Sequence, residues 1–311
     1  MVALDHRDAR PLYLQVKDSD RQTTLSTNVL FGVQSVTMKD KGLTGMYYDT
    51  ALAAPALADN ANSALILGMG TGTYARQLKQ YYPKMNITGV EIDQKITDLA
   101  GEYFDEPADI PVTTYDGRAW LAASHDKYDV IMVDAYQDIT IPFQMSSTEF
   151  FTMVREHLNP GGVMVVNMNM ISDGQGSINE ALSDTIASVF GNGNTLTADV
   201  PNTTNRELFA KKPGSGSEEN SIQQASKALN LRETTYERTG SEDLEWYMEE
   251  VASRFRKVNE PDSASTILTD DKAPVEVLGM HAIDQIIADE AGPYRQILKD
   301  EGFGGLLRAV Q

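Results

Sequence analysis

Four short segments of the chain carry the residue types that could do chemistry. The first is GMGTG (residues 68–72), which directly follows an apolar run and precedes a helical pattern that begins near Thr73. Glycines at alternate positions let the backbone turn sharply and approach a ligand with no Cβ in the way. The helix behind them would offer free N–H groups and the positive end of its dipole. The pattern predicts a ligand-binding turn, although an ordinary strand-to-helix turn has the same composition.

Carboxylates end the next three predicted strands. Glu91 follows the glycines by about 20 residues, where an acidic side chain can accept both hydroxyls of a ribose. Asp116 ends the third strand, where a carboxylate would lie near an adenine amino group, and Asp134 ends the fourth. Glycines and Glu91 alone would fit a nicotinamide dinucleotide equally well. Asp116 favours a nucleoside site of the S-adenosylmethionine type, because ligands of open α/β sheets bind at the carboxyl ends of the strands.

These side chains need a sheet to bring them together. From residue 63 to about residue 212, short apolar runs alternate with helical patterns. Strand and helix alternating at this spacing predict a doubly wound, Rossmann-like, mostly parallel sheet with helices on both faces. The expected strands are ALILGMG (64–70), NITGVEID (86–93), IPVTTYDG (110–117), YDVIMVDAY (128–136) and GGVMVVNMN (161–169).

Three regions are expected along the chain. Residues 1–58 form a small β-rich element, and residues 59–212 form the Rossmann-like nucleoside-binding catalytic domain. Residues 213–311 begin with a Pro/Gly/Ser-rich linker and continue as a helical C-terminal extension, in which SEDLEWYMEEVASRFRKV (241–258) has a helical pattern capped by Ser241.

Composition excludes several classes of protein. The net charge of −19, from 26 Lys+Arg and 45 Asp+Glu, disfavours binding to nucleic acid. It indicates a solvated acidic surface or an acidic field that gathers a cationic substrate. No apolar run is long enough to span a bilayer and no signal peptide is visible, so a cytoplasmic location is expected. Cysteine is absent and the four histidines lack metal-ligand spacing, so no metal is expected.

The motifs from Leu65 to Asn167 resemble those of S-adenosylmethionine-dependent transferases, and among these they are most similar to spermidine synthases, the polyamine aminopropyltransferases. The fold implied is of the class I methyltransferase type. The segment ILTDDKAPVEVL (267–278) is similar to one in membrane-fused spermidine-synthase-like proteins. The looser resemblance extends from Leu12 to Leu278. The motifs that carry it most strongly are GVEIDQKITDLAGEYF (89–104), YDGRAWL (115–121), YDVIMVDAY and FFTMVREHLNPGGVMVVN (150–167).

The resemblance implies a role for each matching residue on the donor side. The donor would be S-adenosylmethionine or its decarboxylated form, used as a co-substrate. Its methionine-derived part would pack against the glycine turn, its ribose would bind Glu91, and its adenine would contact the end of the third strand. The implied donor-binding residues are Gln34, Gly68, Gly70, Thr71, Gly72, Glu91, Ile92, Asp116, Gly117 and Asp134.

On the acceptor side, the resemblance implies that Asp134 orients and deprotonates the attacking amine, with Tyr136 as a second catalytic candidate. Tyr48, Gln137 and Asp138 would bind the substrate, and Gln34 and Tyr48 would close the pocket over the tail of the donor.

Two positions depart from the family pattern. Spermidine synthases usually have an aspartate at the position of Thr71, and a second aspartate at the position of Gln137. Each charged contact in a dry site contributes roughly 1–3 kcal/mol, so the loss of two carboxylates weakens recognition of a dication. The donor half therefore matches the family more closely than the acceptor half does.

The leading hypothesis is an aminopropyltransferase that moves an aminopropyl group from decarboxylated S-adenosylmethionine to a small amine or polyamine, with methylthioadenosine as by-product. The alternatives are a methyltransferase or another S-adenosylmethionine-consuming enzyme on this fold, and a non-catalytic domain that binds a nucleoside or polyamine. The resemblance also raises two expectations about assembly, namely a homodimer and attachment to a membrane domain in a longer protein.

Overall fold

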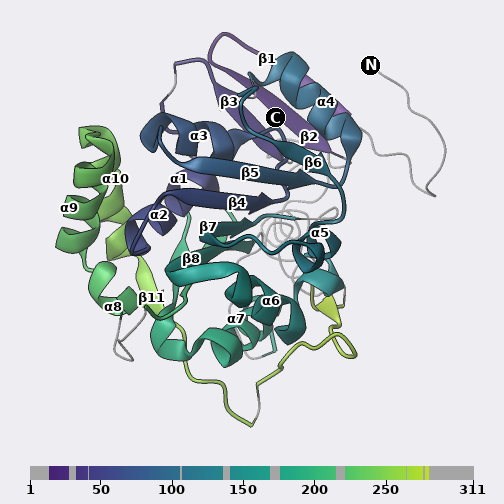
Figure 1. The fold of residues 1–311 in the computed structure, drawn as a ribbon, viewed down its shortest axis with the longest axis vertical. Coiled ribbons are helices and arrows are strands. Elements are labelled where there is room, and N and C mark those ends of the chain that lie inside the picture. The colour runs from purple at the N-terminus through teal and green to yellow at the C-terminus, as the bar shows by residue number, and fades with distance from the viewer. Residues whose placement is uncertain are drawn as a thin grey trace, which may run out of the picture.

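The structure is a computed structural model, shown in Figure 1. The residues that it describes are 14–27, 33–40, 42–105, 107–135, 141–168, 176–214, 221–263, 265–275 and 277–279.

The centre of the molecule is an eight-stranded sheet with the order β11-β9-β10-β8-β7-β4-β5-β6 (Figure 1). Pairing is parallel from β8 through β7, β4 and β5 to β6, and antiparallel from β8 through β10 and β9 to β11. The predicted mostly parallel α/β fold is therefore confirmed. The strands are β4 (Ser63–Leu67), β5 (Asn86–Glu91), β6 (Val112–Thr114), β7 (Tyr128–Val133), β8 (Leu158–Met168), β9 (Thr195–Asp199), β10 (Arg206–Lys211) and β11 (Phe255–Lys257).

Helices cover both faces of this sheet, because successive side chains of the central strands β4, β7 and β8 enter two different cores. In β4, Ile66 points into the first core and Leu67 into the second. Both faces are buried, which explains why the strands are nearly continuous apolar runs. The first core is completed by α1 (Tyr47–Ala51), α2 (Ala53–Leu57), α3 (Thr73–Tyr81), α8 (Ser221–Ala225), α9 (Ala228–Thr239) and α10 (Glu242–Ser253), and the second by α5 (Gly117–Ala123), α6 (Thr148–His157) and α7 (Ile178–Phe190).

Helix α4 and two short 3₁₀ helices lie between these elements along the chain. Helix α4 (Gln94–Tyr103) follows β5 and packs against β5 and β6. The short 3₁₀ helix η1 (Phe143–Met145) precedes α6, whereas η2 (Asn192–Asn194) joins α7 to β9.

A smaller antiparallel sheet of β1 (Leu14–Asp18), β2 (Gln22–Thr27) and β3 (Ser35–Met38) precedes the large one. Strand β3 is fixed to the start of α3, because Thr73 Oγ1 donates to the carbonyl of Val36 at 2.7 Å and accepts from the amide of Val36 at 3.2 Å. This contact places the residues at the start of β3 beside the glycine turn.

Two local predictions are wrong. Residues 47–57, expected to be part of a β-rich element, form α1 and α2. The helical pattern of residues 241–258 ends at Ser253, and Phe255–Lys257 form strand β11 instead. The edge of β9 offers backbone partners to this segment, and the ring of Phe255 packs edge-on against Phe209 at 5.6 Å. Tertiary contact therefore outweighs local helix preference here.

Beyond β11, the chain forms a turn in which Thr269 pairs with Lys272, and Leu268 and Val275 on either side of this turn are buried in the second core. Among the residues that the structure describes, no helix combines the length and the apolar character that a bilayer crossing requires.

Candidate active site

The glycine turn between β4 and α3 lies against the chain that leaves β7. Gly68 has a φ of +89°, which favours glycine, and a Cβ there would collide with the backbone carbonyl of Asp134. The amide of Gly68 donates to the carbonyl of Val90 at 2.9 Å, and that of Asp134 donates to Leu67 at 2.8 Å. Gly70 and Gly72 also have positive φ, at +56° and +79°. The turn therefore brings the ends of β4, β5 and β7 within contact of one another.

Glu91 holds the glycine turn from the end of β5. Its Oε2 accepts the amide of Gly70 at 2.8 Å, and its Oε1 accepts the amide of Asp93 at 3.0 Å. Burial raises the pKa of Glu91, and the backbone amides of Asp93, Gly70 and Ile92 oppose that rise. Three backbone amides occupy three of the roughly four acceptor positions of the carboxylate, so it can still accept a hydrogen bond from a ribose hydroxyl. The next side chain, Ile92, is 69% exposed.

Asp116 ends β6 and begins α5. Its Oδ1 accepts the amide of Ala119 at 2.8 Å, so the carboxylate caps the helix. Gly117 is the first residue of α5, and the preceding Tyr115 is 56% exposed. The residue predicted to contact adenine thus also fixes the start of a helix.

Asp134 is the centre of a polar cluster just after β7. Its Oδ2 accepts the hydroxyl of Tyr47 at 2.6 Å and its Oδ1 accepts the side-chain amide of Asn167 at 2.9 Å. Asn205 in turn donates to Oδ1 of Asn167 at 2.9 Å. Burial raises the pKa of Asp134 to about 7. The bonds from Tyr47 and Asn167 pull this pKa down, and the charge of Glu91 pushes it up.

Tyr47 reaches Asp134 from α1, whose first turn is fixed by a buried carboxylate. Asp49 accepts the amides of Thr44 and Gly45 at 2.9 Å and 2.6 Å, and the side chain of Gln77 on α3 at 2.5 Å. Burial and the charge of Asp134 raise the pKa of Tyr47 well above its usual value, so its hydroxyl stays protonated and acts as a donor.

Tyr48 closes the neighbouring space. Its ring packs on that of Tyr47, with centroids 4.0 Å apart, and its hydroxyl donates to the carbonyl of Gln34 at 2.8 Å. Burial also raises the pKa of Tyr48. The two residues predicted to close the pocket, Gln34 and Tyr48, therefore contact each other beside the predicted catalytic aspartate.

Thr71 carries a buried hydroxyl that has no hydrogen-bond partner among the described residues. Its side chain is fully buried in the glycine turn. The amide of Thr71 lies 3.4 Å from Oγ of Ser35 on β3. A buried hydroxyl without a partner is costly, and a polar group of a bound donor would satisfy it. The unpartnered hydroxyl of Thr71 and the remaining acceptor capacity of Glu91 together fit an adenosine-type co-substrate.

A second buried carboxyl group, Glu207, lies on β10 directly opposite Asn167 of β8. Residues opposite each other in an antiparallel pair point to the same face of the sheet. Glu207 is fully buried, and neither of its carboxyl oxygens has a hydrogen-bond partner within the described part of the chain. Burial and the charge of Asp134 raise the pKa of Glu207 well above its usual value.

The structure brings most of the predicted residues together and adds three that the sequence did not reveal. Gln34, Tyr48, the glycine turn, Glu91 and Asp134 converge at one edge of the sheet, and Asp116 with Gly117 follows the neighbouring strand at the same edge. Tyr136, Gln137 and Asp138 lie outside the described residues. The residues that sequence reasoning missed are Tyr47, Asn167 and Glu207.

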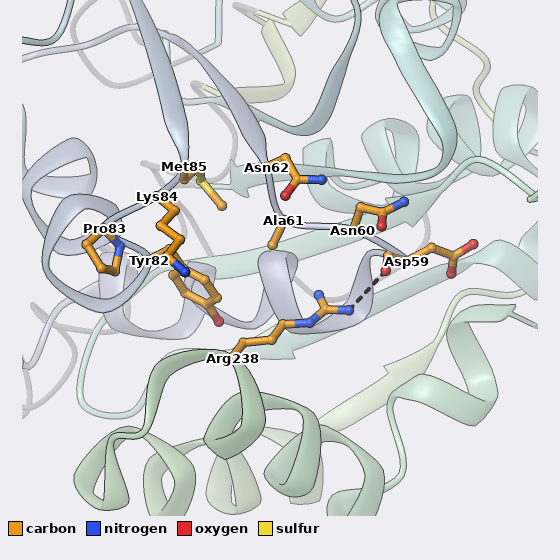
Figure 2. Close-up of a pocket in the computed structure, with 9 residues that line it drawn as sticks. All are labelled: Asp59, Asn60, Ala61, Asn62, Tyr82, Pro83, Lys84, Met85 and Arg238. Carbon is orange, nitrogen blue, oxygen red and sulfur yellow. Dashed lines mark hydrogen bonds between the residues drawn. The ribbon is translucent and has the colours of Figure 1, made fainter.

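A cavity of about 350 Å³ lies elsewhere, where β4 and β5 begin, and Figure 2 shows its lining. Arg238 of α9 donates to the carbonyl of Asp59 at 3.1 Å there. The carboxyl ends of the same two strands carry the glycine turn and Glu91, so this cavity is at the opposite edge of the sheet from the predicted site. It is lined by Asp59, Asn60, Ala61, Asn62, Tyr82, Pro83, Lys84, Met85 and Arg238.

Comparison with known proteins places the chain in a family. The family model of the spermine/spermidine synthase domain matches residues 46–212. A "Probable polyamine aminopropyl transferase" of Bifidobacterium longum is 98% identical over 299 residues, 96% of this chain and 67% of that protein. A polyamine aminopropyltransferase of Corynebacterium efficiens is 37% identical over 131 residues, 38% of this chain and 25% of that protein. Both relatives are thus longer than the segment they share with this chain.

Among solved structures, a probable spermidine synthase from Corynebacterium glutamicum superposes with a TM-score of 0.58. It is 19% identical, and the match covers 84% of this chain and 99% of that one, which shows a shared fold. Family model, near-identical relative and fold agree, and they support aminopropyl transfer as the reaction. The chain is therefore a transferase of the spermine/spermidine synthase family.

Proposed function

We propose that this chain transfers an aminopropyl group from decarboxylated S-adenosylmethionine to a small amine or polyamine and releases methylthioadenosine. The observation that carries the proposal is the environment of Asp134. A carboxylate with a pKa of about 7 lies beside the glycine turn, at the edge of the sheet where ligands bind in this class of fold.

On the donor side, Glu91 binds the ribose hydroxyls, and Asp116 with Gly117 contacts the adenine. Ile92 lines the adenine side with its exposed side chain. The glycine turn and Thr71 face the methionine-derived part, where the buried hydroxyl of Thr71 gains the partner that it lacks. Gln34 and Tyr48 close the site beside the glycine turn, and the hydrogen bond from the hydroxyl of Tyr48 to the carbonyl of Gln34 holds them together.

The chemistry that the bound donor supplies is a propyl carbon activated by a sulfonium leaving group. The protein supplies alignment and a proton acceptor. Asp134 takes the N–H proton of the acceptor as the new N–C bond forms, and the electron pair of the broken C–S bond stays on sulfur. The product is an aminopropylated amine, a neutral thioether and a protonated Asp134.

The raised pKa of Asp134 suits this role. An alkylammonium has a pKa near 10, so an ordinary aspartate of pKa about 4 would be some six units too weak a base. A pKa of about 7 halves that gap while leaving a substantial ionised fraction at neutral pH. Tyr47 and Asn167 orient the carboxylate, because each donates to a different oxygen of Asp134.

The acceptor is proposed as a small amine or polyamine bound near Asp134, and Tyr136, Gln137 and Asp138 stay candidates for its catalysis and binding on the resemblance alone. Gln137 replaces the family carboxylate of the acceptor side, so an acceptor of lower charge than a diamine is the sharper form of the proposal. The net charge of −19 would gather either cation by long-range attraction. A cytoplasmic location stays a prediction from the sequence pattern, and a homodimer and attachment to a membrane domain stay predictions of the resemblance.

The test is to incubate the chain with decarboxylated or ordinary S-adenosylmethionine and a panel of mono-, di- and triamines, and to follow the products by mass spectrometry. We expect methylthioadenosine and an aminopropylated amine. S-adenosylhomocysteine would show methyl transfer instead, and nucleoside binding without turnover would show a non-catalytic domain.

A variant links the reaction to its base. Asp134→Asn keeps the shape of the side chain but removes the proton acceptor, so kcat should fall by about 10²–10⁴. Donor affinity should stay within about tenfold, because the nucleoside contacts lie on other residues. A fully active Asp134→Asn enzyme would refute the role of Asp134.

A further inference from the structure

The turn near the end of the described chain makes contacts that its exposed position does not predict. Asp270 lies in the turn closed by Thr269 and Lys272, beside α5 and α6 at the yellow end of the ribbon in Figure 1. Both of its carboxylate oxygens bind one guanidinium: Nη1 of Arg118 donates to Oδ1 at 2.7 Å and Nη2 to Oδ2 at 2.6 Å. A bidentate pair of this kind fixes relative orientation as well as distance.

Arg118 extends this contact to two other segments. It is the second residue of α5, directly after Asp116 and Gly117 of the proposed adenine loop. Its Nη1 also donates to the backbone carbonyl of Gln144 at 2.7 Å, in the 3₁₀ helix η1. Gln144 lies in residues 141–168, the described segment that comes after the one ending with Asp134 and Ala135. One guanidinium thus joins the turn to the start of α5 and to η1.

Asp270 also contacts the start of α6. Ser147, the N-cap of α6, donates its hydroxyl to Oδ1 of Asp270 at 2.5 Å while accepting the amide of Phe150. The amide of Asp270 donates to Oε2 of Glu149 at 3.0 Å.

The rest of the turn is fixed by backbone contacts to two helices. The amide of Thr148 donates to the carbonyl of Leu268 at 2.9 Å, and the amide of Leu268 donates to Oγ1 of Thr185 on α7 at 2.9 Å. The backbone of the turn and the buried side chain of Leu268 therefore hold the turn in place independently of its exposed side chains.

We propose that Asp270 is a positioning residue of the donor site, which holds the start of α5 and residues 141–147 in one fixed arrangement. This inference rests on the proposed function only where it is tested by nucleoside binding. Asp270 does not touch the adenine loop directly. It acts through Arg118 on the loop of Asp116 and Gly117, and through Arg118 and Ser147 on the segment that leads into α6.

The pair contributes geometry more than stability. The side chains of Arg118 and Asp270 are 21% and 41% exposed, and ion pairs that contact water add little to the stability of a fold. A guanidinium held by three oxygens nevertheless has one orientation, and small displacements of binding groups have large effects on affinity and rate. Hydrogen bonds from Arg118 lower the pKa of Asp270, so the pair stays charged at neutral pH.

The adjacent residue gives a matched control. Asp271 lies in the same turn, is exposed and has the same side chain. The full chain carrying Asp270→Asn is compared with Asp271→Asn and wild type in calorimetric titrations with methylthioadenosine and in steady-state kinetics. We expect Asp270→Asn to raise the Kd for methylthioadenosine and the KM for the donor about tenfold, with kcat within about threefold. Asp271→Asn should match wild type.

Hydrogen exchange gives a readout that does not depend on any ligand. Amides of residues 117–121 and 141–147 should exchange faster in Asp270→Asn and at the wild-type rate in Asp271→Asn. Arg118→Lys keeps the charge but cannot bind both oxygens, so it should reproduce both effects, and it carries the test if Asp270→Asn fails to fold.

Wild-type affinity together with wild-type exchange in Asp270→Asn or Arg118→Lys would overturn the proposal. A wild-type chain that binds no nucleoside would instead refute the proposed function, and the exchange rates alone would then decide whether Asp270 holds the two segments.

Discussion

The hydroxyl of Tyr47 donates a 2.6 Å hydrogen bond to Oδ2 of Asp134, across 87 positions of the sequence. Helix α1 provides this donor from the layer that covers one face of the sheet, and β7 provides the acceptor from the sheet itself. The basicity of Asp134 is therefore set by the packing of a five-residue helix as well as by burial.

Tyr47→Phe should shift the pH dependence of the reaction. The hydroxyl stabilises the ionised form of Asp134, so its removal raises the pKa of this aspartate above about 7. Catalysis needs the ionised form, and the acid limb of the kcat profile should therefore move to higher pH. The variant should be slow at pH 7 and recover much of its rate at pH 9.

Tyr48→Phe is the matched control for that measurement. The hydroxyl of Tyr48 donates to the backbone carbonyl of Gln34 and not to Asp134, so the acid limb should stay in place. An equal shift in both variants would show that loosening of α1, and not the bond to Asp134, moves the profile.

Glu91→Ala should weaken binding of the donor and leave the chemical step less affected. The change removes the proposed ribose partner and also the acceptor for the amide of Gly70. Charged hydrogen bonds contribute about 1.5–3 kcal/mol each, which corresponds to a loss of roughly 10- to 100-fold in affinity. Calorimetric titration with methylthioadenosine measures this loss of affinity. An unchanged Kd would show that Glu91 does not bind the nucleoside.

Gly68→Ala should disrupt the site, whereas Gly101→Ala should be tolerated. A Cβ at Gly68 would collide with the carbonyl of Asp134, and its φ of +89° strains any other residue. Gly101 lies in α4 with open space around it, where alanine gains about 0.5–1 kcal/mol of helix stability. The Tm of thermal unfolding and kcat should both fall in Gly68→Ala. In Gly101→Ala the Tm should stay the same or rise.

Glu207→Gln should stabilise the fold increasingly as pH rises. The pKa of Glu207 is raised in the folded chain, so the folded state keeps a proton that the unfolded state releases above about pH 4.5. Its contribution to stability is complete below that pH and is lost above it, at up to about 1.4 kcal/mol per pH unit for one proton. Glutamine stays neutral and avoids this loss.

The measurement is the difference in Tm between Glu207→Gln and wild type from pH 5 to pH 9, which should grow with pH. Glu237→Gln, at an exposed position on α9, is the control and should show a difference that does not change with pH. A pH-independent difference for Glu207→Gln would mean that Glu207 is ionised in the folded chain.

The sheet and the glycine turn were predictable because local pattern determines them. An apolar run that is buried on both faces, such as β7, has few alternatives to a strand in a parallel sheet. The strand, turn and helix around Gly68 indicate which edge of that sheet would bind a ligand. Asp134 followed from its position after β7. The same reasoning could not predict β11, because its pairing with β9 is a tertiary contact that overrides a helical pattern.

The partners of Asp134 could not be predicted for a related reason. Tyr47 and Asn167 are single residues in a helix and a strand, and nothing in their neighbours marks them as polar contacts of a carboxylate. Glu207 offered one clue, because it is an acidic residue directly before the apolar run LFA of β10. Its position opposite Asn167, however, is set by strand register.

The two edges of the large sheet are its shortest described strands, β6 (Val112–Thr114) and β11 (Phe255–Lys257). An exposed strand edge is a template on which another chain can pair, and proteins limit this with short edges and charged residues. Both edges here offer three residues, and β11 carries the exposed cations Arg256 and Lys257. The layer that holds Asp134 is thus poorly suited to recruit strands from other copies, which should keep the chain from aggregating edge to edge at high concentration.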